Sequence, residues 1–171
     1  MNITIRKFDD TDIPNKVRWI NDQRNNQYLH YDLPLELEKT KKWFETVKDR
    51  TDRYDAVIEA DGIPVGLIGL LNIDEKNKKA EYYISMGEHS YKRKGIAYNA
   101  SVQILEYAFL VLKLNKVYLN VDSQNTAACV LYEKLGMICE GEFAQDLWHR
   151  GEFIDRKRYG ILASDFLSQR S

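Results

Sequence analysis

The sequence predicts a single α/β domain in which helices flank a mixed, mostly antiparallel central sheet. The length of 171 residues, with 44% hydrophobic and 30% charged residues, suits one domain with a sizeable core. Segments that alternate between apolar and polar residues, as strands do, are interspersed with segments of three- and four-residue apolar spacing, as in helices. Tight-turn sequences such as Asp61-Gly62 join neighbouring strands. We therefore expect residues 1–171 to form one domain.

The first half of the chain predicts a strand, two helices and then three antiparallel strands. Ile3 to Arg6 alternates like a half-buried strand, and Thr11 and Asp12 offer caps for a helix that continues to Asn21. The polar and aromatic segment from Asn21 to Leu35 is either a binding loop or an ordinary helix connection. The elements expected next are a helix over 36–48 and strands over 54–60, 63–73 and 79–86.

The second half predicts two helices alternating with strands. A helix over 95–112 precedes a short strand over 116–121, and a helix over 125–135 ends at Gly136, a natural left-handed cap. Two last strands, over 138–148 and 152–162, flank a turn at Arg150-Gly151. The apolar face expected for the first of these helices comprises Ala97, Ala100, Ile104, Ala108 and Val111.

Charge and composition exclude several classes of partner. The 25 Lys+Arg against 26 Asp+Glu give a net charge of −1, so we expect no nucleic-acid and no membrane partner. The longest apolar stretches are too short to span a bilayer. Two cysteines without a Cys-x-x-Cys pair, and a start without the apolar run of a signal peptide, indicate a cytoplasmic protein. The sequence leaves open whether the chain forms a homo-oligomer.

Neither metal chemistry nor covalent catalysis is indicated. His30, His89 and His149 are far apart and have no Cys, Asp or Glu at zinc-ligand spacing, so no metal site is expected. No Gly-x-Ser-x-Gly elbow marks a nucleophile. Any catalytic or binding site must therefore be built without a metal ion or a covalent nucleophile.

A basic loop with one glycine, Lys92-Arg93-Lys94-Gly95-Ile96-Ala97, precedes the long helix. The first turn of a helix has free N–H groups and a partial positive charge, and basic side chains strengthen its attraction for phosphate oxygens. The loop has neither the Walker nor the Gly-x-Gly-x-x-Gly pattern. Unless it is only a solvated turn, we expect it to hold a pyrophosphate on the backbone of Arg93 to Tyr98.

These residues resemble the (Gln/Arg)-x-x-Gly-x-(Gly/Ala) motif of the GNAT superfamily, with Gly95 and Ala97 at the small positions. Lys92 departs from the motif, because the family usually has Gln or Arg there. The resemblance covers about Tyr54 to Leu162. Its other segments are Ala80 to Gly87, Lys116 to Val121, Asn125 and Leu131 to Met137.

Two further segments, Asn125 to Ala128 and Gly151 to Arg156, look like one branch of the superfamily. That branch contains ribosomal-protein N-terminal acetyltransferases and bacterial spermidine acetyltransferases, and some amino-sugar acetyltransferases are similar. The acceptor is not narrowed further by these residues.

The resemblance implies an N-acetyltransferase that moves an acetyl group from acetyl-CoA to a primary amine by direct attack in a ternary complex. A polyamine, a protein N-terminus and an amino sugar all remain possible acceptors. An amine with a pKa near ~10 must lose a proton before it attacks, and the expelled thiolate must gain one. The alternative is a coenzyme-A-binding sensor or regulatory module without turnover.

The resemblance also implies roles for individual residues. Tyr132 is the expected acid, or else a core aromatic, and Glu81 is the expected base, although water can take that role and a solvated strand glutamate is the alternative. Asn125 is expected to contact the pantetheine or Tyr132. The coenzyme is expected to lie against Ser85, Met86 and Gly87, where the strand splays from its neighbour unless this is an ordinary strand end, and against Lys92, Arg93, Lys94, Gly95, Ile96, Ala97 and Tyr98.

Several aromatic and acidic residues are candidates for the acceptor pocket. The aromatic ones would form its walls and the acidic ones would hold a cationic amine. They are Tyr28, Tyr31, Trp43 and Trp148, and Asp22, Glu36 and Asp146.

Overall fold

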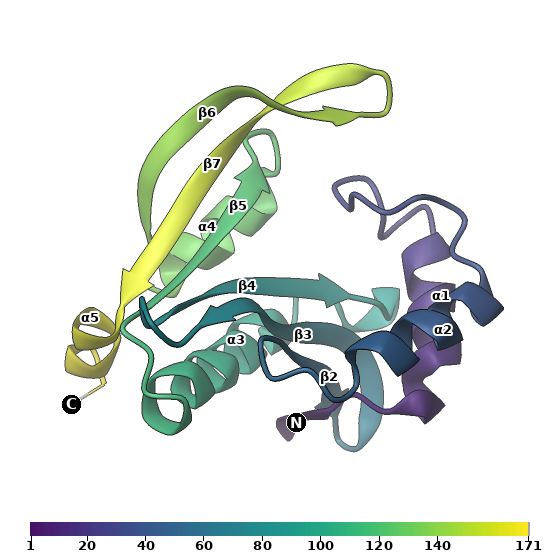
Figure 1. Ribbon diagram of the computed structural model, residues 1–171, viewed down its shortest axis with the longest axis horizontal. Helices are drawn as coiled ribbons and strands as arrows, with labels where there is room; N and C mark the ends of the chain where they lie inside the picture. Colours follow the sequence, from purple (N-terminus) through teal and green to yellow (C-terminus); the bar gives the residue numbers. More distant parts are fainter. Residues whose placement is uncertain (171) are drawn as a thin grey trace.

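A seven-stranded sheet with helices on both faces forms the protein, in a computed structural model that describes residues 1–170 (Figure 1). The strand order is β1-β2-β3-β4-β5-β7-β6. Every neighbouring pair is antiparallel except β4 and β5, which are parallel. The expected single α/β domain with a mixed, mostly antiparallel sheet is confirmed. Within residues 1–170, no helix combines the length and the apolar character that crossing a membrane requires.

The first half of the chain forms the expected elements, with one difference at the first helix. Asp12 is the N-cap residue of this helix, as expected, but its side chain forms no capping hydrogen bond there. Asp9 caps the 3-10 helix that precedes it, because its side chain accepts a hydrogen bond from the Thr11 amide and closes a capping box with Asp12. Asp12 instead pairs with Arg6 at 2.8 Å. The elements are β1 (Ile3–Lys7), the short 3-10 helix η1 (Asp10–Asp12), α1 (Ile13–Asn21), α2 (Leu37–Val47), β2 (Tyr54–Ala60), β3 (Ile63–Asp74) and β4 (Lys79–Met86).

The second half also follows the expected order, with additions that the sequence pattern did not indicate. These are the 3-10 helix η2 (His89–Tyr91) and the C-terminal helix α5 (Ala163–Ser168). The other elements are α3 (Ile96–Glu106), β5 (Lys116–Asp122), α4 (Thr126–Lys134), β6 (Ile138–His149) and β7 (Glu152–Leu162).

The long helix changes its period near its end, which corrects the expected apolar face. After Glu106 it continues as a π-helix, η3 (Tyr107–Val111), and the amide of Leu112 bonds to the Tyr107 carbonyl five residues back. The wider turn rotates the residues that follow. Val111 is therefore 63% exposed, whereas Ala108 and Phe109 are buried.

Side chains of β4 alternate between the two faces of the sheet and so connect two hydrophobic clusters. The even-numbered Tyr82 belongs to the larger cluster with residues of α3 and α4, and its hydroxyl contacts Ser101 of α3. The odd-numbered Tyr83 packs against the smaller cluster under α1 and α2. Alternate residues of a strand point to opposite faces, so β4 presents a different set of groups to each side.

The sheet splits between its two parallel strands. β4 and β5 pair only from Lys79 to Glu81 and from Lys116 to Tyr118. Beyond this point β5 pairs with β7 up to Asp122, and β5 and the last hairpin turn away from β4 (Figure 1). The later part of β4 therefore has a free edge toward the split.

The close packing around β3 predicts a stability difference between two glycines. A Cβ at Gly69 would run into the Tyr54 carbonyl oxygen and the Tyr83 ring, whereas one at Gly141 on β6 would meet nothing within 4 Å. We expect Gly69→Ala to lower the free energy of unfolding by about 1–3 kcal/mol, the usual cost of overpacking. Gly141→Ala should change it by less than about 0.5 kcal/mol, as surface substitutions do. Urea denaturation of both variants measures this, and equal midpoints would contradict the packing.

Candidate active site

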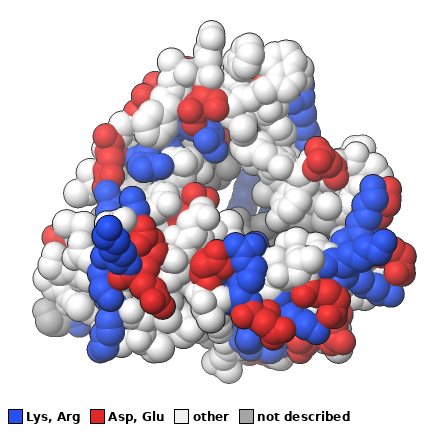
Figure 2. All heavy atoms as spheres, in the orientation of Figure 1, with Lys and Arg blue, Asp and Glu red and all other residues white. Residues whose placement is uncertain are grey.

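A cavity of about 470 Å³ lies at the split and is lined by residues from both faces of the sheet. From the α3 and α4 side it is lined by Tyr82, Ile84, Met86, Leu119 and Tyr132, and from the α1 and α2 side by Lys16, Tyr31, Arg53, Asp55, Glu81, Tyr83 and Ser85. Figure 2 shows a hollow near the middle of one face, with Lys or Arg atoms in its depth. Two molecules that approach from opposite faces would meet here.

The loop between α1 and α2 crosses over the split and contacts both sides of it. On the far side, the Tyr28 hydroxyl donates to the Gln124 carbonyl at 3.3 Å, and Arg150 donates to the Asn26 carbonyl at 2.9 Å. The His149 ring lies 3.0 Å from the Gln27 carbonyl. The segment from Asn21 to Leu35 is thus positioned as a wall of the cavity.

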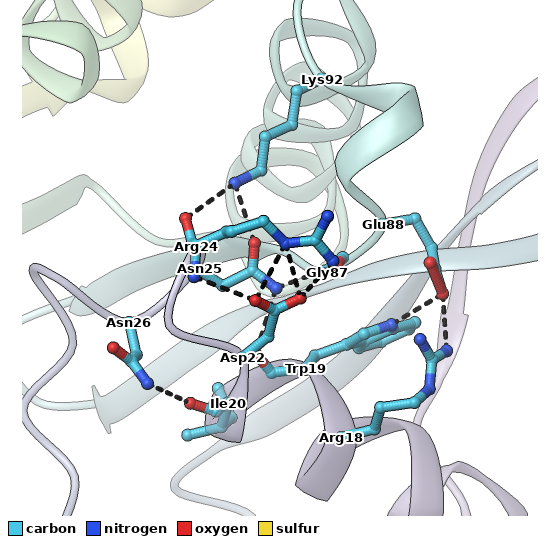
Figure 3. A network of polar contacts seen from close by, with 10 residues as sticks. All are labelled: Arg18, Trp19, Ile20, Asp22, Arg24, Asn25, Asn26, Gly87, Glu88 and Lys92. Carbon is cyan, nitrogen blue, oxygen red and sulfur yellow. Dashed lines mark hydrogen bonds and ion pairs between the residues drawn. The ribbon is translucent and has the colours of Figure 1, made fainter.

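On the near side, Asn25 fastens this loop to the end of β4 (Figure 3). Its side-chain nitrogen donates to the Gly87 carbonyl at 2.9 Å and to the Trp19 carbonyl at 3.1 Å. Its side-chain oxygen accepts a 2.8 Å hydrogen bond from the Lys92 ammonium. A Cβ on Gly87 would collide with the Trp19 ring, so only glycine allows this close approach.

Lys92 therefore contacts the loop between α1 and α2, and its ammonium already forms hydrogen bonds there. Besides Asn25, the ammonium reaches the Arg24 carbonyl at 3.4 Å. Burial lowers the pKa of Lys92 below its usual value, while the charge of Asp22 opposes that shift. The side chain that replaces the usual Gln or Arg of the motif thus links the loop before α3 to the loop after α1.

The start of α3 presents the backbone groups that a phosphate needs. Gly95 caps the helix with a φ of 75°, a left-handed conformation that suits glycine. The first intrahelical acceptor is the Gly95 carbonyl, bonded by the Asn99 amide, so the amides of 96–98 have no helical partner. Arg93 and Lys94 are exposed beside this turn, and the Ile96 side chain is buried, which leaves only its backbone for a ligand.

Ser85, Met86 and Gly87 were expected to offer their backbones to the pantetheine. Of these three, only Met86 has backbone groups that face the split. The Gly87 amide donates to the Val65 carbonyl of the β2–β3 side at 2.8 Å. Because backbone groups alternate direction along a strand, Ser85 also faces β3, and Ile84 and Met86 face β5. The expectation for the Ser85 and Gly87 backbones is therefore corrected, although the Ser85 side chain lines the cavity.

Tyr132 lies on the buried face of α4 and lines the cavity, so it is both a core aromatic and a cavity residue. Its ring is 5.9 Å from Tyr82 and 5.7 Å from Tyr159. Among residues 1–170 nothing forms a hydrogen bond with its hydroxyl, and burial raises its pKa well above the usual value, with a smaller effect of Cys129. The hydroxyl therefore stays protonated and available for a ligand.

Asn125 and Glu81 differ in whether their side chains bond to other groups of the protein. Asn125 caps α4, because its side-chain oxygen accepts from the Ala128 amide at 3.3 Å. Both residues line the cavity. Glu81 lies opposite Tyr118, at the last position where β4 pairs with β5. No described residue forms an ion pair or hydrogen bond with its carboxylate. Its charge, after burial, contributes to raising the pKa of Tyr118.

Only some of the residues predicted for the acceptor pocket line the cavity. Tyr28 and Tyr31 line the cavity, and Trp43 lines a neighbouring one with Glu36. Trp148 is 61% exposed and meets the Phe153 ring edge to face at the tip of the last hairpin. Two predicted acidic residues are engaged elsewhere, Asp22 with Arg24 at 2.7 Å and Asp146 with Arg156 at 2.7 Å.

The sequence reasoning missed a polar cluster on the α1–α2 side of the cavity, formed by Lys16, Arg53, Asp55 and Tyr83. Arg53 pairs with Asp55 at 2.7 Å, and the Tyr83 hydroxyl donates to Asp55 at 2.5 Å. Burial acts to raise the pKa of Asp55, but these hydrogen bonds hold it below its usual value. For Lys16 a signal was present, since it shares the apolar spacing of Ile13 and Ile20 on α1.

No group of three or more His, Cys, Asp or Glu side chains within the described part of the chain is arranged to hold a metal ion. The polar groups that line the split are instead hydroxyls, carboxylates and the cationic side chains of Lys16, Arg53 and Lys92. They suit acyl transfer, in which an oxyanion needs donors and a leaving group needs a proton.

Comparison with known proteins decides the family. Residues 2–138 match the acetyltransferase (GNAT) domain family. The chain belongs to this family. It is therefore an N-acetyltransferase that uses acetyl-CoA, as the sequence resemblance implied.

Within the GNAT family, the chain is similar to proteins of known name and structure. It is 31% identical over 157 residues to spermidine N(1)-acetyltransferase of Escherichia coli K12, covering 84% of this chain and 83% of that one. It is 32% identical over 108 residues to the putative ribosomal N-acetyltransferase YdaF of Bacillus subtilis, covering 62% and 57% of the two chains. The crystal structure of spermidine N-acetyltransferase from Vibrio cholerae with CoA and spermine superposes with a TM-score of 0.90, at 27% identity over 96% of this chain and 98% of that one.

The left-handed cap of α3 gives a test of the coenzyme site. We expect Gly95→Val to remove most of the thermal stabilisation that coenzyme A causes, because a β-branched residue resists this conformation and would displace the free amides. Gly62→Val is the matched control, since Gly62 has a similar φ of 81° and equally open surroundings but lies in the β2–β3 turn. An unchanged shift in folded Gly95→Val would contradict the placement.

The contact between Lys92 and Asn25 gives a second test. We expect Lys92→Met to raise the Michaelis constant for the amine about three- to tenfold, the effect of losing a hydrogen bond worth about 1 kcal/mol. The constant for acetyl-CoA should move less. Lys94→Met is the comparison, because Lys94 stands beside the start of α3 and should affect acetyl-CoA instead. The opposite pattern for Lys92 would make it a pyrophosphate ligand, as the motif implies.

Proposed function

We propose that this acetyltransferase passes the acetyl group directly to a primary amine while its two substrates occupy opposite faces of the split. The observation that carries the proposal is the single cavity lined by residues of both faces. The α3 side supplies the free amides and the basic loop that suit a pyrophosphate, and the α1–α2 side supplies polar and charged side chains that suit a small amine.

The coenzyme side would work as follows. The amides of 96–98 would bind the pyrophosphate, and the free backbone groups of Ile84 and Met86 would pair with the pantetheine as a missing strand would. The Met86 amide would then lie where it can stabilise the oxyanion. Asn125 keeps its side-chain nitrogen for the same molecule, since its oxygen is used by the Ala128 amide.

The transfer itself needs proton movements at the nitrogen and at the sulfur. The amine nitrogen attacks the thioester carbon, the carbon–sulfur bond breaks, and Tyr132 would give its proton to the departing sulfur. Before the attack, the ammonium loses one proton to Glu81 or to a water in the cavity. After the attack the nitrogen loses a second proton, and this one replaces the proton that Tyr132 gave to the sulfur. Glu81 suits the role of base because no described residue neutralises its carboxylate, and water remains the alternative.

The relatives suggest which amines to try first. The relatives whose names state an acceptor are spermidine N(1)-acetyltransferases and a putative ribosomal N-acetyltransferase. A polyamine, a protein N-terminus and an amino sugar are therefore the acceptor classes to compare. The alternative of a module without turnover has no observation in its favour, since the hydroxyl of Tyr132 has no structural partner within the described residues.

We also propose that the enzyme acts as an oligomer in the cytoplasm. A similar structure, of spermidine N-acetyltransferase from Vibrio cholerae, is described as dodecameric and superposes with a TM-score of 0.85. In this chain Trp148 and Phe153 on the last hairpin are 61% and 60% exposed, and exposed aromatic residues of this size are typical of interfaces.

Tyr132 gives the decisive test of the mechanism. With the amine that releases coenzyme A fastest, we expect Tyr132→Phe to lower the turnover number by roughly 10²- to 10⁴-fold, the scale of a lost general acid. The Michaelis constant for acetyl-CoA should change little, because the ring remains.

Tyr159→Phe is the matched control. It removes a neighbouring buried hydroxyl that donates to Glu133 at 3.1 Å and does not line the cavity, so its turnover should stay near that of the wild type. Melting temperatures verify that both variants fold. A folded Tyr132→Phe within about threefold of the wild-type turnover would show that the phenol only packs.

A further inference from the structure

Lys16 is a charged residue in an apolar position. It lies on the face of α1 that also carries Ile13 and Ile20, and only 8% of its surface is exposed. Lysine is almost never buried to this extent without a partner, because water solvates its charge far better than a protein interior does. A buried charge at this position therefore indicates that something other than water stabilises it.

No anion of the protein neutralises this ammonium. Within residues 1–170 it forms no ion pair and no hydrogen bond, and its near neighbours are rings, with Trp43 at 3.5 Å and Tyr31 at 5.8 Å from their centroids. Contact with the rings offsets part of the lost hydration. Asp55 acts on Lys16 from a distance, but its oxygens are taken by Arg53 and Tyr83.

The balance of charges around Lys16 is positive. Burial lowers its pKa to about 8, the charge of Asp55 offsets part of this, and Arg53 adds to it. Lys16 and Arg53 both line the main cavity, and Asp55 is the carboxylate between them. Glu81 and Asp122 also line this cavity, but only Asp55 and Arg53 are close enough to act on Lys16. Around Lys16 there are therefore two cations, counting Lys16 itself, and one carboxylate that is already engaged.

Lys16 is buried in the protein, but it lines two cavities. Lys16 and Tyr31 line both the main cavity and a neighbouring one of about 480 Å³ against α2. A group entering from the acceptor side would meet the ammonium before it reaches the part of the cavity lined by Ser85 and Tyr132. A cation here would be repelled, and an anion would find the partner that the protein does not supply.

We propose that the amine acceptor carries an anionic oxygen group, a carboxylate or a phosphate, and that Lys16 binds this group while the amine reaches into the split. The inference rests on the proposed acetyl transfer and specifies its substrate class. Spermidine, which carries only positive charges, lacks the group that Lys16 would bind. The substrate would thus differ from spermidine, which the relatives' names state, because it would carry an anionic group away from the amine.

Matched amines test this by coenzyme A release. Glucosamine 6-phosphate is compared with glucosamine, and glycylglycine with its C-terminal amide, so that each pair differs in one anionic group, phosphate or carboxylate. Spermidine is the polycation. For the wild type we expect one anionic member to exceed its neutral partner at least about tenfold in kcat/KM, the effect of one charge-assisted contact.

Substitution of Lys16 assigns the preference to its charge. In Lys16→Met the ratio within the pair should fall to less than about threefold, and in Lys16→Arg it should be retained, since the guanidinium also binds carboxylate and phosphate. Lys41→Met is the matched control, because Lys41 is exposed on α2 and pairs with Glu38. Its ratio should equal that of the wild type.

The outcomes separate this inference from the proposed function. Wild-type enzyme that prefers spermidine or the neutral members overturns the anion site, even if Lys16→Met does not fold. So does a preference that folded Lys16→Met retains. If no amine releases coenzyme A, the acetyl transfer itself is overturned and the anion site with it.

Discussion

An unpaired strand edge inside the protein is the constraint on which the site depends. Backbone N–H and C=O groups away from water need partners, and β4 has none on its β5 side beyond Glu81. The groups of Ile84 and Met86 therefore face a cavity that a substrate must complete. The same divergence of strands opens the cavity that both faces line, so the binding edge and the meeting point of the substrates have one origin.

The polar contacts of Asn25 give this opening a fixed shape. A single amide holds two carbonyls, of Trp19 and Gly87, and receives the ammonium of Lys92 (Figure 3). Because Gly87 follows β4 and Lys92 precedes α3, the loop between α1 and α2 is held by the segment that connects β4 to α3.

Local patterns predicted the elements well, because strand alternation, the Asp61-Gly62 turn and the Gly136 cap depend on neighbouring residues only. The position of Gly95 before a helix was equally local. Lys92 could not be placed, because its partner Asn25 is 67 residues away in the sequence. The direction of the Ser85 and Gly87 backbones follows from pairing with β3, which a single strand does not reveal. The π-helix that exposes Val111 left no sign in the apolar spacing.

The sheet separates two hydrophobic clusters of unequal size, and this gives the two halves of the site separate stabilities. The larger cluster holds α3 and α4, and the smaller one, with Phe8, Ile13 and Trp19, holds α1. Regions with fewer buried contacts open at lower free energy than the core. Local opening of α1 and α2 would therefore dissolve the acceptor side first and leave the coenzyme side folded. The α3–α4 side of the cavity can thus stay formed while the α1–α2 side opens and closes.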